Sequence, residues 1–477
     1  MSFRAAWAGA AALWLPLGLA VAQTESAPAD EASLQQKVDE QEQRLKVLER
    51  KLEIQDETAA ANATHPVVKT GAKGFSIGTP DGANIIKFRA NLAVDGRWFG
   101  DDVTPQTADT FLFRRVRPYI EGTLANIYDF RLMPDFAGGR SIILDAYING
   151  KFKPWLNVQA GKFKGPVGLE RLQPDQYNRF LELGFPSSLV PNRDLGVQIA
   201  GDAAGGVLSY AVGYFDGTTD GTSTDANATP DVDNDGKKDV EARLFLQPFL
   251  NSSNFYLRGF GVGIGGTHVN TTGSATATSP GSAAATLLPS YRTPGQQTFF
   301  SYRGGDTPTI ANGDRDRWTP QLYYYLGRFG LIAEYAAVSQ EVSRQVSSTV
   351  RRSDKLENAA WQASVSWFLT GEDAAYAGFT PNSTFEIGKP GWGAWEVVAR
   401  YHELKIDDDA FTGGSASFAN PSTAARRARA AGIGLNWYLT QNMKWMLDYE
   451  RTRFDGGAAA GDRPDEKALL TRFSLVF

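Results

Sequence analysis

The fold of this chain is decided by TRFSLVF, residues 471–477. Apolar or β-branched side chains recur at every second position from Thr471 to Phe477, and Arg472 and Ser474 lie between them. Successive side chains of a β-strand point to opposite faces, so this spacing predicts a strand with one apolar and one mixed face. The aromatic last residue predicts that the apolar face ends at an interface.

The same alternation recurs far upstream. WQASVSWFL (361–369) alternates apolar with polar side chains, and so do IIKFRANLAVDGRW (85–98) and GIGLNWYL (432–439). Alternation sustained over this length indicates strands with two different faces. We expect sixteen strands, roughly at 85–99, 111–124, 127–137, 142–152, 154–164, 195–202, 206–216, 239–248, 255–268, 314–326, 329–343, 355–370, 393–405, 425–439, 442–454 and 466–477.

The predicted connections alternate between tight turns and long loops rich in Gly, Ser, Thr, Asp and Pro. Two break the rule: 138–141 is short on the long-loop rim, and 371–392 is long on the short-turn rim. Tight turns on one rim and long loops on the other are typical of outer-membrane barrels. The sequence therefore predicts an all-β fold, a 16-stranded antiparallel transmembrane β-barrel over residues 74–477, with a short N-terminal coiled-coil helix.

A soluble β-sandwich or solenoid is the alternative, and either would bury its apolar face against another layer of protein. Neither needs aromatic residues at strand ends, whereas a membrane barrel places them in two girdles. Aromatic residues near predicted strand ends are Trp98, Phe99, Phe111, Tyr128, Trp155, Tyr214, Trp318, Trp367, Trp437 and Trp445. In lipid, every edge amide is satisfied only by a closed ring, so TRFSLVF should pair with the first strand. Its Phe477 resembles the signal read by the barrel-assembly machinery.

The N-terminus predicts export. Residues 1–22 contain one cation, Arg4, then an apolar stretch and Ala20-Val21-Ala22. This pattern predicts a signal peptide cleaved after Ala22, and the alternative is a membrane anchor helix. Cys is absent, so an exported protein of this size must rely on backbone pairing and packing rather than disulfides.

Residues 31–57 predict a helix whose apolar positions step by four and three. Leu34, Val38, Leu45, Leu48 and Leu52 follow a heptad seam, in which Gln41 and Gln55 are polar positions. We expect a short oligomeric coiled coil in the periplasm, followed by a linker, over residues 23–73. The alternative is a lone amphipathic helix.

Several function classes are disfavoured. The net charge of −5 argues against a nucleic-acid partner. The three histidines form no recognisable Ser/His/Asp pattern, and neither a phosphate loop nor a His/Glu metal motif is present, so we expect neither an enzyme nor a cofactor. Asp231, Asp233 and Asp235 have the spacing of a calcium loop, but Ala242 occupies the position of the bidentate Glu. A solvated acidic loop is favoured over a metal site.

Several segments in order resemble the phosphate-selective porin O/P family: GKFKGPVGLERLQ (161–173), PNRDLGVQIAGD (191–202), DVEARLFLQPF (239–249), YRTPGQQTFFSYR (291–303) and RWTPQLYYYLGRFGLIAEY (317–335). The resemblance runs from about residue 75 to the end. It implies a homotrimeric, 16-stranded outer-membrane porin whose constriction is lined by Arg and Lys. It also implies passive diffusion of small anions, with phosphate or polyphosphate first, and does not fix which anion is preferred.

If the apolar face meets lipid, the other face lines the lumen. This predicts the pore-lining cations Lys87, Arg89, Arg97, Arg115, Arg117, Arg131, Arg243, Arg315 and Arg317, whereas Arg114 should point outward unless a bulge intervenes. Guanidinium groups match phosphate oxygens in pairs and stay protonated. A series of such sites would pass an oxyanion along the pore.

Residues 165–194 are too long and irregular for a strand, and trimeric porins fold a loop inward at this point. The best candidates for the constriction are Lys162, Lys164, Arg171, Arg179 and Arg193. The alternative is that the loop cations are solvated or pair with Glu170, Asp175, Glu182 and Asp194.

Acidic residues also fall on the predicted lumen face: Asp95, Glu121, Asp129, Asp135, Asp145, Glu241, Glu334, Glu396, Asp448 and Glu450. Opposed acids and bases suit a general diffusion porin with weak charge preference, which is the first alternative function. The second is a structural outer-membrane anchor whose coiled coil holds a partner. Expected partners are outer-membrane lipid and lipopolysaccharide, small anions and further copies of the chain.

Overall fold

The computed structural model describes residues 28–62, 65–71, 74–100, 108–139, 141–221, 233, 235–276 and 285–477. The chain divides into two units between His65 and Pro66. The predicted signal peptide lies outside the described residues. Among those that are described, no helix combines the length and apolar character needed to span a bilayer.

The first unit contains α1 (Pro28–Asn62), which confirms the predicted helix over 31–57. Two ion pairs along its surface, Arg44 with Glu40 and Arg50 with Glu53, stabilise the helix itself. The predicted seam is exposed in the single chain, since Leu34, Val38, Leu45, Leu48 and Leu52 are each half or more accessible.

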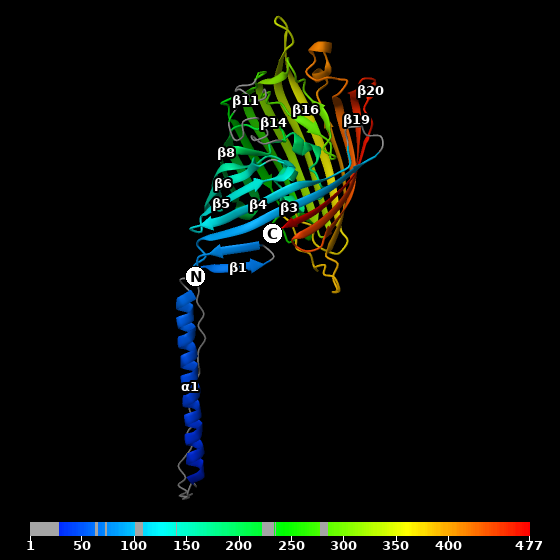
Figure 1. Cartoon of the computed structure of the whole chain (residues 1–477). Coiled ribbons are helices and arrows are strands. Elements are labelled where there is room, and N and C mark those ends of the chain that lie inside the picture. Colours follow the sequence, from blue (N-terminus) through cyan, green and yellow to red (C-terminus); the bar gives the residue numbers. More distant parts are fainter. Residues whose placement is uncertain are drawn as a thin grey trace. The chain divides into compact units, whose positions relative to one another are not determined.

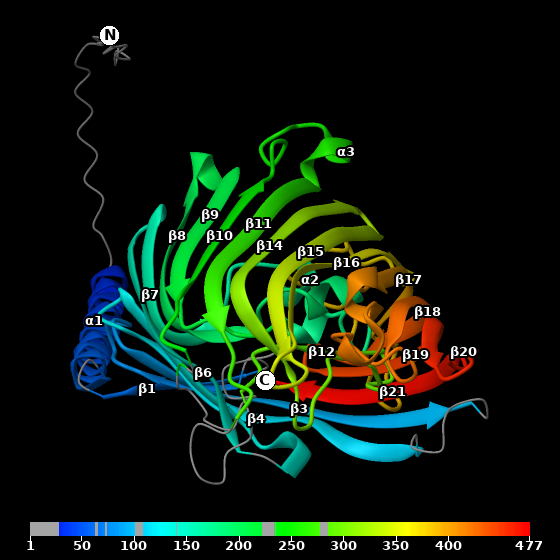
Figure 2. The same ribbon diagram turned by 90° about the horizontal axis from the view of Figure 1, so that it is seen from above.

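The second unit is a closed antiparallel barrel of sixteen strands (Figures 1 and 2). The strands are β3 (Ile85–Phe99), β4 (Thr110–Leu124), β5 (Tyr128–Asp135), β6 (Ile142–Lys153), β7 (Leu156–Lys164), β8 (Arg193–Ala203), β9 (Leu208–Phe215), β10 (Asp239–Leu246), β11 (Phe260–Thr272), β14 (Thr309–Leu326), β15 (Phe329–Gln345), β16 (Arg351–Phe368), β17 (Ala394–Lys405), β18 (Ala425–Tyr438), β19 (Met443–Ala458) and β21 (Glu466–Val476). Strand β21 pairs with β3, with Phe473 opposite Val94, so TRFSLVF closes the ring as predicted.

Smaller elements complete the unit. They are β1 (Val67–Gly71), β2 (Gly74–Gly78), β12 (Ser290–Arg292), β13 (Thr298–Ser301), β20 (Gly461–Asp462), α2 (Leu169–Leu172), α3 (Phe255–Arg258), η1 (Ala137–Gly139), η2 (Asp175–Tyr177), η3 (Phe185–Ser188), η4 (Ala204–Gly206), η6 (Asp408–Phe411) and η7 (Gly414–Ala416). The β1–β2 hairpin extends the sheet by pairing with β3, so strand structure begins before the predicted boundary at residue 74. The predicted start of a strand at residue 255 is wrong: α3 occupies that position because Asn254 caps a helical turn.

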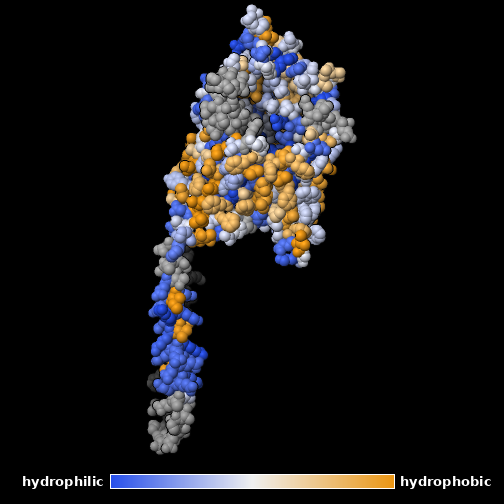
Figure 3. Space-filling view, viewed as in Figure 1, coloured by the Kyte–Doolittle hydropathy of each residue, from blue (hydrophilic) through white to orange (hydrophobic). Residues whose placement is uncertain are grey.

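The two faces of the wall have opposite chemistry. On β16, Trp361, Val365 and Trp367 are exposed on the outside, whereas Gln362 and Ser366 are buried on the inside. Figure 3 shows the outer apolar side chains as a band across the strands. In a membrane this band would contact the hydrocarbon of the lipid, and the polar side chains would face the interior of the barrel.

The interior of the barrel is filled unevenly. The segment 165–192, which contains α2, η2 and η3, lies inside the ring of strands (Figure 2). The β12–β13 hairpin packs with it at the long-loop end, where Tyr291, Phe299 and Phe300 join one apolar cluster with Phe185. The long connection 371–392 reaches it from the other end, since Tyr376 donates a hydrogen bond to the Leu169 carbonyl oxygen at 2.7 Å.

Candidate anion pore

The segment 165–192, here called the constriction loop, is held by acceptors on the barrel wall. The Leu169 amide donates to Glu334 Oε1 at 2.6 Å, and the Leu181 amide donates to Asp448 Oδ2 at 2.7 Å. The loop pairs some of its backbone amides internally, such as Tyr177 with the Pro174 carbonyl oxygen, and the wall supplies acceptors for others. Acidic residues predicted on the lumen face therefore serve to dock the loop.

Donors from the wall complete the docking. Lys444 Nζ donates to the Asn178 carbonyl oxygen at 2.7 Å, and Arg400 Nη1 donates to that of Glu182 at 2.9 Å. Arg472 Nη1 donates to the Leu181 carbonyl oxygen at 2.5 Å. These donors lie on β17, β19 and β21, so they fix the loop against this part of the barrel wall. The space that the loop leaves free lies toward strands β3–β8.

Two cavities occupy that free space. One, of about 670 Å³, opens toward the long-loop rim, and the other, of about 510 Å³, lies toward the short-turn rim. Four charged side chains line both: Arg117, Lys164, Asp175 and Arg193. The two cavities adjoin at these four residues, which are therefore the candidates for the narrowest part of a passage, and we call them the constriction ring.

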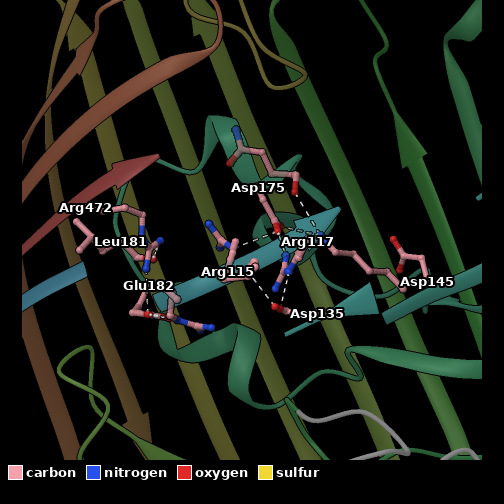
Figure 4. A network of polar contacts seen from close by, with 12 residues as sticks. Arg115, Arg117, Asp135, Asp145, Asp175, Leu181, Glu182 and Arg472 are labelled. Carbon is pink, nitrogen blue, oxygen red and sulfur yellow. Dashed lines mark hydrogen bonds and ion pairs between the residues drawn. The ribbon is translucent and has the colours of Figure 1, made fainter. Parts of the chain in front are cut away.

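The constriction ring is built around one carboxylate (Figure 4). Asp175 Oδ2 accepts from Arg117 Nη1 at 2.6 Å and lies 3.4 Å from Arg115 Nε, and its Oδ1 accepts from Lys164 Nζ at 3.4 Å. Burial raises the pKa of Asp175, but the charges of Arg115, Lys164 and Arg117 outweigh burial and hold it well below its usual range. Asp175 is therefore ionised and offsets only part of the surrounding positive charge.

Both cavities carry an excess of cations. The larger one is lined by eight cationic and four acidic side chains: Arg97, Arg114, Arg115, Arg117, Lys164, Arg171, Arg193 and Arg292, with Asp135, Asp175, Glu182 and Asp220. The smaller one is lined by five and three: Arg89, Arg117, Arg131, Lys164 and Arg193, with Glu121, Asp145 and Asp175. A positive surplus in a narrow, partly desolvated passage attracts anions even though the chain as a whole is acidic.

A second ionic cluster fixes the tip of the constriction loop. Glu182 Oε1 lies 2.7 Å from Arg114 Nε, 2.8 Å from Arg97 Nη2 and 3.3 Å from Arg472 Nη2. Asp95 accepts from Arg472 at 2.6 Å on the adjoining strand. Burial opposes ionisation of Glu182, but Arg114 above all lowers its pKa below the ordinary range. The tip is thus an ion-paired anchor.

Most predicted cations reach the pore. Arg97, Arg115, Arg117, Lys164, Arg171 and Arg193 line the larger cavity, and Arg89 and Arg131 line the smaller one. Lys87 is half-buried on the same inward face of β3 as Arg89. Arg114 also faces inward, because a register shift opposite Ala93 and Val94 makes it the bulged residue, as the sequence allowed.

Other predicted residues lie outside the two cavities. Arg317 is buried between Asp220, in the segment after β9, at 2.7 Å and Asp239, on β10, at 3.0 Å. Arg315 lies 4.0 Å from Asp239. Arg179 approaches Glu396 and the Tyr325 ring on the docked side of the loop. Arg243 donates to Gln321 at 2.9 Å, and Lys162 is almost fully buried.

Sequence reasoning missed three cations that position the loop: Arg400, Lys444 and Arg472. The alternation in TRFSLVF already placed Arg472 on the inner face, and the same rule applied to β17 and β19 gives Arg400 and Lys444. Their role depends on where the loop lies, which alternation does not predict.

The suggested calcium loop finds no support among the described residues, where no group of three His, Asp or Glu side chains could hold a metal ion. Asp231 lies outside the described residues. Asp233 pairs with Lys238, and Asp235 accepts from the Thr271 hydroxyl at 2.6 Å. Asp233 therefore pairs within its own loop, and Asp235 links that loop to the end of β11.

Comparison with known proteins settles the family. The profile described as phosphate-selective porin O and P matches residues 86–477. The chain belongs to this family. Membership implies a channel rather than an enzyme and, with the closed barrel, makes the chain a porin of the outer membrane, which confirms the resemblance seen in the sequence.

The porin is similar to Porin O of Pseudomonas aeruginosa, with 23% identity over 452 residues, 88% of this chain and 94% of that protein. Solved structures with a similar fold include OmpT of Vibrio cholerae, at 10% identity and a TM-score of 0.48, covering 83% of this chain and 98% of that one. Another is the anion-selective porin from Comamonas acidovorans, at 10% identity and a TM-score of 0.48, covering 83% and 100%.

Proposed function

We propose that this porin passes small anions by passive diffusion, with phosphate or polyphosphate as the preferred class. The observation that carries the proposal is the constriction ring, where Arg117, Lys164 and Arg193 surround the single carboxylate of Asp175. Guanidinium groups bind phosphate oxygens in pairs, and they keep their charge at every physiological pH. Membership of the phosphate-selective porin O and P family supports this class of pore.

Conduction also requires release. An oxyanion must bind each site well enough to enter and weakly enough to leave. Asp175, Asp135 and Asp145 already occupy part of the hydrogen-bonding capacity of Arg117 and Arg193. An entering anion therefore competes with fixed carboxylates, which limits its residence time.

The assembly belongs to the same proposal. Export with cleavage after Ala22 would place α1 in the periplasm, where its exposed leucine seam suits a coiled coil between copies of a homotrimer. The exposed apolar outer face would contact outer-membrane lipid and lipopolysaccharide. Recognition by the barrel-assembly machinery would use Phe477.

Recording in planar bilayers tests the function. We expect a reversal potential that shows chloride to be more permeant than potassium, and a current that phosphate blocks. Cation preference or absence of phosphate block would favour the general diffusion porin, to which the many wall carboxylates are also suited. Absence of any conductance by folded protein would favour the structural anchor.

A further inference from the structure

The smaller cavity changes its chemistry between the constriction ring and the short-turn rim. On β4, Tyr119 follows Arg117 and lies nearer to the short-turn rim, and on β7, Gln159 lies nearer to that rim than Lys164. The same change from charged to uncharged polar residues occurs on β6 and β8. We call the four uncharged residues that line this side of the cavity the neutral lining: Tyr119, Tyr147, Gln159 and Gln198.

Strand register and one cation hold the neutral lining together. Gln159 and Gln198 are directly opposite each other on β7 and β8. Tyr147 is opposite Arg131, whose guanidinium carbon lies 5.5 Å from the centre of the Tyr119 ring and 5.9 Å from that of the Tyr147 ring. These cation–π contacts fix both rings against the same guanidinium group.

The hydrogen-bonding groups of the neutral lining are not used within the described chain. Gln198 Oε1 is buried and has no hydrogen-bond partner there. The hydroxyls of Tyr119 and Tyr147 and the amide of Gln159 form no hydrogen bond with any described residue. Tyrosine hydroxyls and glutamine amides both donate and accept hydrogen bonds. A ligand that carries hydroxyl groups can therefore replace water at this lining.

The charges on this side of the ring are largely balanced. Arg89 Nε lies 2.6 Å from Glu121 Oε1, and Arg131 Nη2 donates to Glu121 Oε2 at 2.7 Å. Asp145 lies 3.6 Å from Arg131 Nη1 and accepts from Arg193 of the ring at 2.7 Å. The arginines nearest the neutral lining thus already have carboxylate partners. This side suits the uncharged part of a ligand better than a second phosphate group.

The smaller cavity has room for such a part. Its volume of about 510 Å³ lies within the range of pockets that bind small organic molecules. A single inorganic phosphate at the constriction ring would not reach the neutral lining on every strand, whereas a phosphate ester would extend from the ring into the cavity.

We propose that the neutral lining binds the hydroxylated body of a sugar monophosphate whose phosphoryl group lies at the constriction ring. The inference rests on the proposed anion-pore function and names a further substrate class for the same pore. Arg117, Lys164 and Arg193 donate to the phosphoryl oxygens. The sugar hydroxyls exchange hydrogen bonds with the two tyrosine hydroxyls and the two glutamine amides.

Single-channel recording of the folded full-length porin tests the subsite. The probes are glucose 6-phosphate, methyl phosphate and inorganic phosphate, each added to both sides of the bilayer in potassium chloride. Methyl phosphate has the same charged ester group without the sugar. We expect half-block of the chloride current at a glucose 6-phosphate concentration about fivefold lower than that of methyl phosphate, because only the sugar reaches the neutral lining.

The variant Tyr119→Phe/Tyr147→Phe keeps both rings and removes both hydroxyls. Half-block by glucose 6-phosphate should then need about fivefold more of it, whereas half-block by methyl phosphate should not change. Tyr325→Phe is the matched control, since it removes a buried hydroxyl on β14 that has no partner in the described chain and lies outside both cavities. The control should be blocked as the wild type is.

The outcomes separate the subsite from the pore. Equal half-block by the two esters in the wild type would overturn the subsite without reference to any variant. Unchanged glucose 6-phosphate block in Tyr119→Phe/Tyr147→Phe, or an equal loss in Tyr325→Phe, would also overturn it, and block by inorganic phosphate would still support the anion pore. Absence of block by all three probes would contradict the proposed function and the subsite with it.

Discussion

Replacing Asp175 by Asn should strengthen the interaction of the pore with phosphate. The change keeps the size of the side chain and removes the one negative charge of the constriction ring. Arg117, Arg115 and Lys164, which lie 2.6, 3.4 and 3.4 Å from the carboxylate, would no longer be neutralised by it. Because the pKa of Asp175 lies well below its usual range, the wild-type charge is present throughout the working pH range.

The magnitude follows from Coulomb's law. A phosphate bound at Arg117 would lie roughly 6 Å from Asp175, where two unit charges interact by about 0.7 kcal/mol in water and about 3 kcal/mol at an effective dielectric constant of 20. A wet pore is closer to the first limit. We therefore expect half-block of the chloride current at a phosphate concentration about three- to tenfold lower than in the wild type, at low ionic strength.

Single-channel recording at a series of phosphate concentrations measures this value. Asp129→Asn is the matched control, since Asp129 pairs with Lys151 at 2.9 Å, outside both cavities, and should leave the block unchanged. Unchanged or weaker block in Asp175→Asn would refute the assignment of the constriction. An equal change in Asp129→Asn would show that net charge, rather than the ring, determines the block.

Four further predictions concern the ring, the loop and the helix. Arg117→Gln removes one of the cations that line both cavities, so it should weaken phosphate block about tenfold and shift the reversal potential toward weaker anion preference. An unaltered block and reversal potential would contradict this. Glu182→Gln removes the charged partner shared by the buried Arg97 and Arg472 and the half-buried Arg114. The loop tip should lose about 3–5 kcal/mol of stability and the current should flicker, and quiet single-channel traces would argue against the anchor. The lowered pKa of Glu182 means that its stabilisation is complete above the unfolded value of about 4.3 and is lost progressively as the pH falls toward the lower folded value, so wild-type conductance should persist at pH 5. Deleting residues 28–62 should leave the conductance of each barrel intact, and its loss would mean that α1 contributes to the pore.

The sequence predicted which residues face the lumen wherever their direction depends only on strand alternation. Arg89, Arg97, Arg117 and Arg131 follow from their positions relative to apolar neighbours, and all four line a cavity. The same rule placed Arg317 on the inner face correctly, but gave no sign that Asp220 and Asp239 would bury it. Facing inward and facing the open passage are separate properties, because loops fill part of the lumen.

The amino-acid sequence by itself determined the closed sixteen-stranded ring, its outer apolar face and its inner cations. Those features depend on period-two alternation and on the requirement that backbone amides in lipid be paired, and both are local to each strand and its neighbours. Only the tertiary structure decided where the passage lies. The constriction loop docks through single hydrogen bonds to residues up to 291 positions away, such as Arg472 with Leu181, and no periodicity encodes contacts between such distant segments.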